Sequence, residues 1–119
     1  MAEAKRIVGL YIMRAYQKAP STSDITLVGP KVPQDHYATI ESMSIINYTT
    51  ANKMLLLGMR DASGKDHYSH NIKAANTYCV QANGQVILRE NESIIGVCLS
   101  PTSADEIYVT AHGFIYPMY

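Results

Sequence analysis

The chain has 119 residues, with ten lysines and arginines balanced by ten aspartates and glutamates, so its formal net charge is zero. A chain of this length predicts one domain that buries roughly 65% of the surface its unfolded form would expose, enough to fold without a disulfide or a metal. Zero net charge argues against a nucleic-acid binder or a protein attracted to anionic lipid, and no apolar run approaches the ~18 residues of a membrane span.

Two features of the composition point to assembly. Charged residues make up 17% of the chain, whereas about 25% is typical of globular domains. The aromatic residues are nine tyrosines and one phenylalanine, with no tryptophan. Tyrosine has an apolar body and a hydroxyl that finds a polar partner, which suits a surface covered by other chains. The composition therefore favours a subunit of an assembly, and the alternative is a tyrosine-rich soluble monomer.

Residues 1–20 are ambiguous between a strand and a helix. Their apolar residues fit helical spacing, but Gly9 interrupts the pattern and β-branched and aromatic residues are frequent. We therefore predict an N-terminal strand or arm, and keep a helix lying outside the main fold as the alternative. The segment lacks an apolar core followed by a cleavage site, so no signal peptide is expected. Residues 21–35, with Gly29-Pro30 and Pro33, are predicted to be rich in loops.

Residues 36–119 carry the strands of the predicted core. Within residues 36–48 the apolar side chains change from one face to the other, which predicts a β-bulge near residues 42–44 or a strand buried on both faces. Further strands are predicted over residues 53–60, 67–74, 93–100 and 107–116. The side chains expected to be largely buried are Ile40, Ile46, Leu55, Leu57, Val80, Ile87, Ile95, Val97, Leu99 and Val109.

Turn signals separate these strands at short intervals, as in sandwiches and barrels. Residues 61–64 (Asp-Ala-Ser-Gly) predict a hairpin loop in which Gly64 has a positive φ. Asn83-Gly84 predicts a type I′ turn that joins a strand over residues 77–82 to a strand over residues 85–89, because both residues tolerate the positive φ angles of such a turn.

The chain is thus predicted to be a single all-β domain over residues 1–119, an antiparallel two-sheet sandwich of jelly-roll-like form. Residues 1–20 would supply an N-terminal strand or arm, residues 21–35 a loop-rich segment, and residues 36–119 the sandwich core.

No arrangement of residues predicts a catalytic or metal site. His67 and His70 have ligand-like spacing, but positions i and i+3 of a strand point to opposite faces, so one zinc ion could not easily take both. Cys79 and Cys98 lack an activating cationic pattern and are predicted to be buried thiols rather than a disulfide. Nucleophile, phosphate-binding and dinucleotide-binding motifs are missing. The sequence therefore predicts a protein that is not an enzyme and needs no metal or organic cofactor.

Four segments of the chain share a pattern with a known family. Residues 29–33 (Gly-Pro-Lys-Val-Pro) lead into a strand ending at residues 45–49 (Ile-Ile-Asn-Tyr-Thr), and residues 55–65 run from an apolar strand into Asp-Ala-Ser-Gly-Lys. Residues 86–94 combine an apolar stretch with a tight polar turn, and residues 104–114 close the pattern. This order resembles small β-sandwich virion proteins of tailed bacteriophages, of the capsid decoration (cement) or head-fibre type. The chain departs from them in the turn within residues 86–94, where Glu-Asn-Glu replaces Pro-Gly-Asp or a similar turn.

The resemblance implies a structural virion protein that decorates and stabilises a phage capsid by adding subunit–subunit interfaces, after assembly in the host cytoplasm. Proteins of this type often form trimers, so a trimeric homo-oligomer is expected. Its partner would be the major capsid protein or another virion protein, with no nucleic acid and no membrane involved. The alternatives are a receptor- or glycan-binding head of a phage fibre, a stand-alone sugar-binding module and a cupin-like enzyme.

Contacts between subunits are expected near the two chain ends. The last residues are too apolar for a solvated tail, and Pro117 prevents the final strand from continuing in the middle of a sheet. They could pack on a neighbouring chain, where tyrosine and methionine are enriched, or fold back to cap their own core. The interface residues predicted on this basis are Tyr11, Phe114, Tyr116, Met118 and Tyr119.

Overall fold

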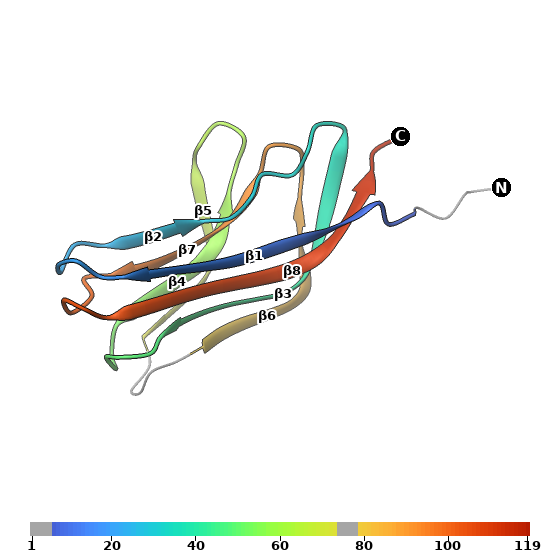
Figure 1. Cartoon of the computed structure of the whole chain (residues 1–119). Coiled ribbons are helices and arrows are strands. Elements are labelled where there is room, and N and C mark those ends of the chain that lie inside the picture. The colour runs from blue at the N-terminus through green and yellow to red at the C-terminus, as the bar shows by residue number, and fades with distance from the viewer. Residues whose placement is uncertain (1–5, 74–78) are drawn as a thin grey trace.

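The computed structural model describes residues 6–73 and 79–119, without the side chains of residues 72 and 79–85. Figure 1 shows two layers of strands stacked on each other. No helix that is long and apolar enough to cross a membrane occurs in this described part. The strands are β1 (Gly9–Lys18), β2 (Ile25–Val28), β3 (His36–Asn47), β4 (Met54–Arg60), β5 (Asp66–Lys73), β6 (Cys79–Leu88), β7 (Ser93–Leu99) and β8 (Glu106–Pro117).

The eight strands form two four-stranded sheets. Their order is β1-β8-β3-β6 in one sheet, which we call sheet A, and β2-β7-β4-β5 in the other, sheet B. All the pairings between neighbours are antiparallel. The pairs β4·β5, β3·β6, β2·β7 and β1·β8 are nested one inside the next, which is the arrangement of an eight-stranded jelly roll. The predicted antiparallel two-sheet sandwich is therefore confirmed.

The first third of the chain differs from expectation in one place. The N-terminal segment forms the strand β1, as preferred over the helix, because Tyr11 and Met13 point into the core while Leu10 and Ile12 point outward. The segment over residues 21–35 was predicted to be loop-rich, but it contains the short strand β2. Burial of two alternating apolar side chains against the core, together with pairing to β7, suffices to form this strand.

The predicted turn at Asn83-Gly84 is wrong, because β6 runs through both residues without interruption. Asn83 pairs with Ser42 of β3. The register of that pairing shifts between Ile40 and Ser42: Ile40 pairs with Val86 and Ser42 with Asn83. Strand β6 therefore has one more residue than β3 in this interval, and the sheet accommodates it as an irregularity. Long-range pairing with β3 thus overrides a strong local turn preference. By contrast, the hairpin loop ending at Gly64 is confirmed, with a φ of 90° at that glycine.

Strand β3 contains the predicted bulge, slightly upstream of the expected position. Its register with β8 shifts between Ile40 and Ser42. Ala38 and Ile40 are buried before the shift, and Met43, Ile45 and Asn47 are buried after it. The bulge therefore moves the inward face by one residue. Ile46, which was predicted to be buried, consequently lies on the outer side of the strand and is only partly covered.

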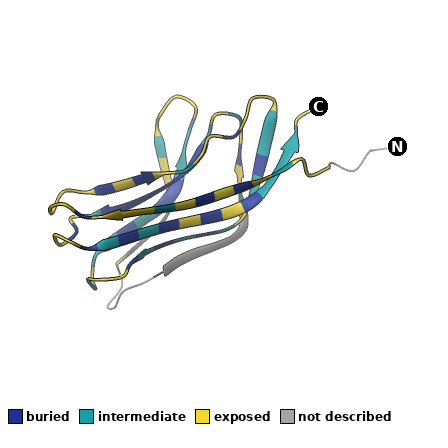
Figure 2. Cartoon of the chain, viewed as in Figure 1, coloured by how far each residue is buried: buried dark blue, intermediate teal, exposed yellow. Residues whose placement is uncertain are grey.

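The core lies between the two sheets, and strands β1 and β8 show the alternation of buried and exposed residues that this requires (Figure 2). Most of the predicted core side chains are buried: Ile40, Leu55, Leu57, Ile95, Val97 and Val109. Leu99 is only partly buried, and Val80 lies outside the described side chains. Ile87 is a clear error, since it is 64% exposed. It pairs with Thr39 on the outer face of sheet A, while its neighbour Leu88 points into the core.

Candidate interaction surfaces

The outer face of sheet A carries exposed apolar side chains at the end where both chain termini lie (Figure 1). The strand registers place Leu10, Phe114, Thr39 and Ile87 in one row across all four strands. Leu10 is 61% exposed and Ile87 is 64% exposed, and Ile12 follows Leu10 on the same face of β1. We call Leu10, Ile12, Ile87 and Phe114 the terminal patch.

A depression of about 390 Å³ lies within this patch, along β1 and β8. Leu10, Ile12 and Phe114 line it together with His112 and Gly113. A side chain at Gly113 would place its Cβ 2.0 Å from the carbonyl oxygen of Thr39, because β8 comes very close to β3 beside the bulge. This close approach therefore requires a glycine at position 113.

The structure separates the five predicted interface residues. Phe114 belongs to the terminal patch, and Tyr116 stacks on Tyr37 at a ring distance of 5.3 Å. Met118 and Tyr119 follow β8 and are 41% and 91% exposed. Together these four place partly or fully exposed side chains at the C-terminal end of the fold.

The fifth predicted residue, Tyr11, has to be removed from the candidate surface because it is buried in the core, with 2% of its surface exposed. Its hydroxyl donates a hydrogen bond of 2.6 Å to the Pro30 carbonyl and accepts one of 3.0 Å from the Ile94 amide. Burial raises the pKa of Tyr11 to about 12, although the bond from Ile94 opposes this shift. Tyr11 therefore links sheet A to sheet B. The alternation of side chains along β1 was the sequence signal that could have predicted the burial of Tyr11.

A second depression, of about 770 Å³, lies further along the same face, away from the chain ends, and shares Thr110 with the first. Tyr108 is one of its lining residues, and the centre of its ring is 4.7 Å from that of Tyr16 and 5.0 Å from that of Tyr48, which lies edge-on. Tyr16 and Tyr48 are 48% and 60% exposed. The Tyr16 hydroxyl donates a hydrogen bond of 3.2 Å to Glu106. We call this the tyrosine depression; its lining residues are Ser44, Ile46, Tyr48, Glu106, Tyr108 and Thr110.

Sequence reasoning missed this group of tyrosines. Tyr16 and Tyr108 are brought together only by the pairing of β1 with β8, and Tyr48 comes from the end of β3. The same face is polar where the two depressions meet: Ser42 bonds to His112 at 2.7 Å, and Ser44 bonds to Thr110, which lines both depressions, at 2.6 Å. The outer face of sheet A thus has an aliphatic end, a polar middle and a tyrosine end.

The outer face of sheet B is also apolar, but its central row on β7 is shielded. Along β7, Ile94 and Cys98 belong to the core cluster. Ile95 and Val97 alternate with them and lie outside that cluster, yet they are only 0% and 4% exposed. They therefore face outward, where Val28 of β2 lies opposite Ile95. Neighbouring strands on both sides cover this central row.

A buried polar network closes the sandwich near the tyrosine depression. Asp105 has no exposed surface, and its carboxylate accepts hydrogen bonds from Asn47, at 2.9 Å, from the Thr50 hydroxyl and from the Thr102 amide. Burial alone would raise the pKa of Asp105, but these bonds and the nearby charge of Lys53 outweigh it, so the pKa lies below its ordinary value. The network joins the ends of β3 and β8 and has a structural role.

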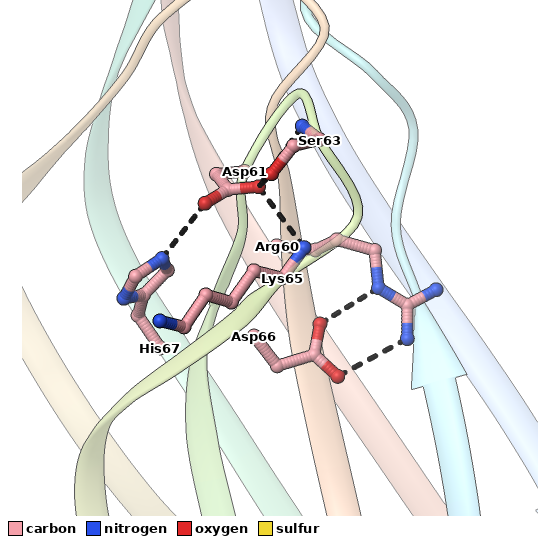
Figure 3. A network of polar contacts seen from close by, with 6 residues as sticks. All are labelled: Arg60, Asp61, Ser63, Lys65, Asp66 and His67. Atoms are coloured by element: carbon pink, nitrogen blue, oxygen red, sulfur yellow. Dashed lines mark hydrogen bonds and ion pairs between the residues drawn. The ribbon is translucent and has the colours of Figure 1, made fainter.

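The hairpin between β4 and β5 holds another polar network (Figure 3). Arg60 makes two hydrogen bonds to Asp66, of 2.7 and 3.2 Å. Asp61 accepts bonds from the Ser63 hydroxyl, from His67 and from the Lys65 amide, which hold its pKa well below the usual range. These contacts stabilise the tight loop between β4 and β5.

The argument that His67 and His70 point to opposite faces is wrong, because β5 has a bulge between them. His67 pairs with Met59 and His70 with Leu57, and these partners lie on one face of β4. The two histidines nevertheless take different partners: His67 bonds to Asp61 and His70 to the Ser69 hydroxyl. Among the described residues, no three histidines, cysteines or acidic residues are grouped as metal ligands.

Cys98 is buried and unbridged, as predicted, while the side chain of Cys79 lies outside the described part. Burial raises the pKa of the Cys98 thiol, although a contact with Asn47 opposes this. A buried thiol with a raised pKa is unreactive. It therefore behaves as a core side chain.

These features define the class of protein as an antiparallel jelly roll with hollowed, partly apolar outer surfaces. No family model matches the chain, and no curated protein matches it. Among solved structures it is similar to a chain from Bacillus endospore appendages, described as disulfide-linked pili, with a TM-score of 0.52 and 14% identity, covering 98% of this chain and 93% of that one. It is also similar to a chain of the cyanophage Pam1 capsid asymmetric unit, with a TM-score of 0.52 and 12% identity, covering 96% of this chain and 88% of that one. At these identities the likeness shows the fold alone.

Proposed function

We propose that the protein is a structural component of a virion, which decorates and stabilises a phage capsid by adding interfaces between subunits. The observation that carries this proposal is the terminal patch. Leu10 and Ile87 are large aliphatic side chains that stand more than 60% exposed on the edge strands of sheet A. Burying apolar surface releases about 25 cal/mol per Å², and exposed apolar side chains gathered on one face in this way are typical of contact sites with other proteins.

The surroundings of the patch support the same role. Ile7 and Val8, ahead of β1, are 47% and 48% exposed, and Met118 and Tyr119 beyond β8 extend the apolar surface. The charged residues needed for a well-solvated surface are few, at 17% of the chain. Exposed aliphatic and aromatic residues at both chain ends fit a subunit that packs against copies of itself and against a capsid protein.

The structural likenesses also support this reading. The two structures described above come, by their descriptions, from a pilus and from a capsid, so both are parts of large assemblies. The capsid chain is covered to 88% by the match, so it is little longer than this domain. A small jelly roll within a capsid is the kind of component that the resemblance in the sequence implies. We propose a trimer, with the major capsid protein or another virion protein as the partner.

Solution mass and capsid binding test the proposal. Light scattering of the wild type should give three times the chain mass, and the protein should cosediment with purified capsids. Leu10→Lys and Ile87→Lys should each weaken self-association or capsid binding at least tenfold without unfolding the monomer, since both side chains are exposed. Val28→Lys is the matched control, because Val28 is 41% exposed on the opposite sheet. A wild type that is monomeric at micromolar concentration and binds no capsid would refute the proposal.

Deleting residues 117–119 separates the two roles considered for the C-terminal end. Loss of the oligomer with a folded monomer would support an interface role for Met118 and Tyr119. General unfolding would show that these residues cap their own core instead.

A further inference from the structure

The tyrosine depression has a chemistry different from that of the terminal patch. Three tyrosine rings gather there, and Ile46 is the one aliphatic side chain in its lining. The polar groups of the lining are the Glu106 carboxylate and the hydroxyls of Ser44 and Thr110. The depression therefore combines flat apolar rings with a set of hydrogen-bonding oxygens, and its two flanking rings, Tyr16 and Tyr48, are about half exposed.

A carbohydrate has the complementary surface. A pyranose ring presents a face of C–H groups, which can lie against a tyrosine ring, and a rim of hydroxyls that both donate and accept hydrogen bonds. Within the part of the chain that the structure describes, the Glu106 carboxylate accepts one bond, of 3.2 Å from Tyr16, and so keeps capacity for a sugar hydroxyl. An apolar surface with a few convergent polar groups is the usual composition of a ligand site.

The charges around the depression favour a neutral ligand. Glu106 is the only charged residue in the lining. In the register of β1 with β8, Lys18 lies opposite Glu106, and Arg14 lies opposite Thr110. A cationic ligand would meet Lys18 and Arg14 on the neighbouring strand, and an anionic ligand would meet the Glu106 carboxylate in the lining, so a neutral ligand is favoured.

From this combination we infer that the tyrosine depression binds a neutral carbohydrate chain. The site lies at the opposite end of sheet A from the terminal patch, so the inference goes beyond the proposed capsid role and does not depend on it. Its open position on a sheet face suits a segment of a longer polysaccharide lying across the exposed rings of Tyr16 and Tyr48. Tyr108 contacts both rings and orients them.

Affinity electrophoresis and calorimetry with a defined panel test this inference. The panel contains β-1,3-glucan, β-1,4-galactan, xylan, mannan and chitin oligomers as neutral probes, and alginate as an acidic one. At least one neutral probe should bind saturably, and tyrosine emission should report the same binding, since the chain has no tryptophan. Tyr48→Ala and Tyr16→Ala should each weaken this binding at least tenfold, and Glu106→Gln should weaken it severalfold.

Tyr68→Ala is the matched control, because Tyr68 is 43% exposed on sheet B and should leave the affinity unchanged. Urea unfolding of each variant confirms that a loss of binding is not a loss of fold. The inference is overturned if no neutral probe binds, if alginate alone binds, or if Tyr48→Ala and Tyr16→Ala bind like the wild type. It is equally overturned if these two variants change only the solution mass or capsid binding, which would make the depression a protein contact.

Discussion

The outer faces of the two sheets are both rich in apolar residues, but the central row of sheet B is covered, whereas the edge strands of sheet A expose theirs. On sheet B, Ile95 and Val97 are 0% and 4% exposed although they point away from the core. On sheet A, Leu10 and Ile87 are 61% and 64% exposed. The same kind of side chain thus stabilises the domain on one face and remains available to a partner on the other.

The position of the strand explains the difference. Ile95 and Val97 lie on β7, which has β2 on one side and β4 on the other, so neighbouring side chains cover them. Leu10 and Ile87 lie on β1 and β6, the two edge strands of sheet A, where each has a neighbour on one side only. Apolar content therefore does not identify an interface by itself; an apolar residue on an edge strand does so more reliably.

This contrast depends on the two sheets keeping their positions, and the largest expected effect comes from the network that fixes one end. Asp105→Ala removes the acceptor for Asn47, Thr50 and the Thr102 amide, and leaves buried donors unpaired. We expect the free energy of unfolding to fall by at least about 3 kcal/mol, measured by urea denaturation.

Asp24→Ala is the control for this variant. Asp24 is an exposed carboxylate at the same end, which accepts a single bond from the Ser100 amide. Its loss should cost about 1 kcal/mol or less. If Asp105→Ala cost no more than Asp24→Ala, the network would not be what holds this end together.

The next effect tests the two faces directly. Ile95→Ala should lower the free energy of unfolding by roughly 2–4 kcal/mol, as expected for a fully buried aliphatic side chain, and so should Leu57→Ala in the core. Leu10→Ala should cost about 0.5 kcal/mol or less, because an exposed side chain leaves no cavity. If Ile95→Ala and Leu10→Ala lowered the free energy of unfolding of the monomeric protein equally, the proposed difference between the two faces would be wrong.

Much of the fold could be predicted from the sequence because its strands alternate and its loops are polar. Val109 was correctly predicted to be buried, and Ile107 and Ala111 share its inner face of β8, while Tyr108 and Thr110 point outward. The errors share one physical cause. At Asn83-Gly84 and at Ile87, the outcome depends on which residue of β3 lies opposite, and local sequence does not contain that register.

The candidate surfaces could be predicted only in part, for the same reason. Phe114 was identified because it lies in an apolar run at the chain end, but Leu10 and Ile87 become part of the same row only through three strand pairings. Tyr11 was wrongly predicted to lie at an interface because the tyrosine content of the chain does not show which tyrosines are buried. The alternation of side chains along β1 decides this and places Tyr11 on the inner face. Residues far apart in sequence, such as Tyr16 and Tyr108, meet only in the folded sheet.

The smallest expected effect concerns acid. The pKa of Asp105 is lower in the folded protein than its ordinary value of about 4. A carboxylate whose pKa is depressed by folding stabilises the protein above its unfolded pKa, and this contribution is lost as the pH falls through the folded pKa. Asp61 and Asp66 also have lowered pKa values, so acid should weaken the wild type and any single variant alike.

The difference in unfolding free energy between wild type and Asp105→Asn removes that shared part. We expect this difference to stay constant from pH 7 to about pH 5 and to shrink below about pH 4. Urea unfolding at intervals between pH 7 and pH 2 measures it, and a difference that stayed constant throughout would mean that Asp105 is not held as a carboxylate by its hydrogen bonds.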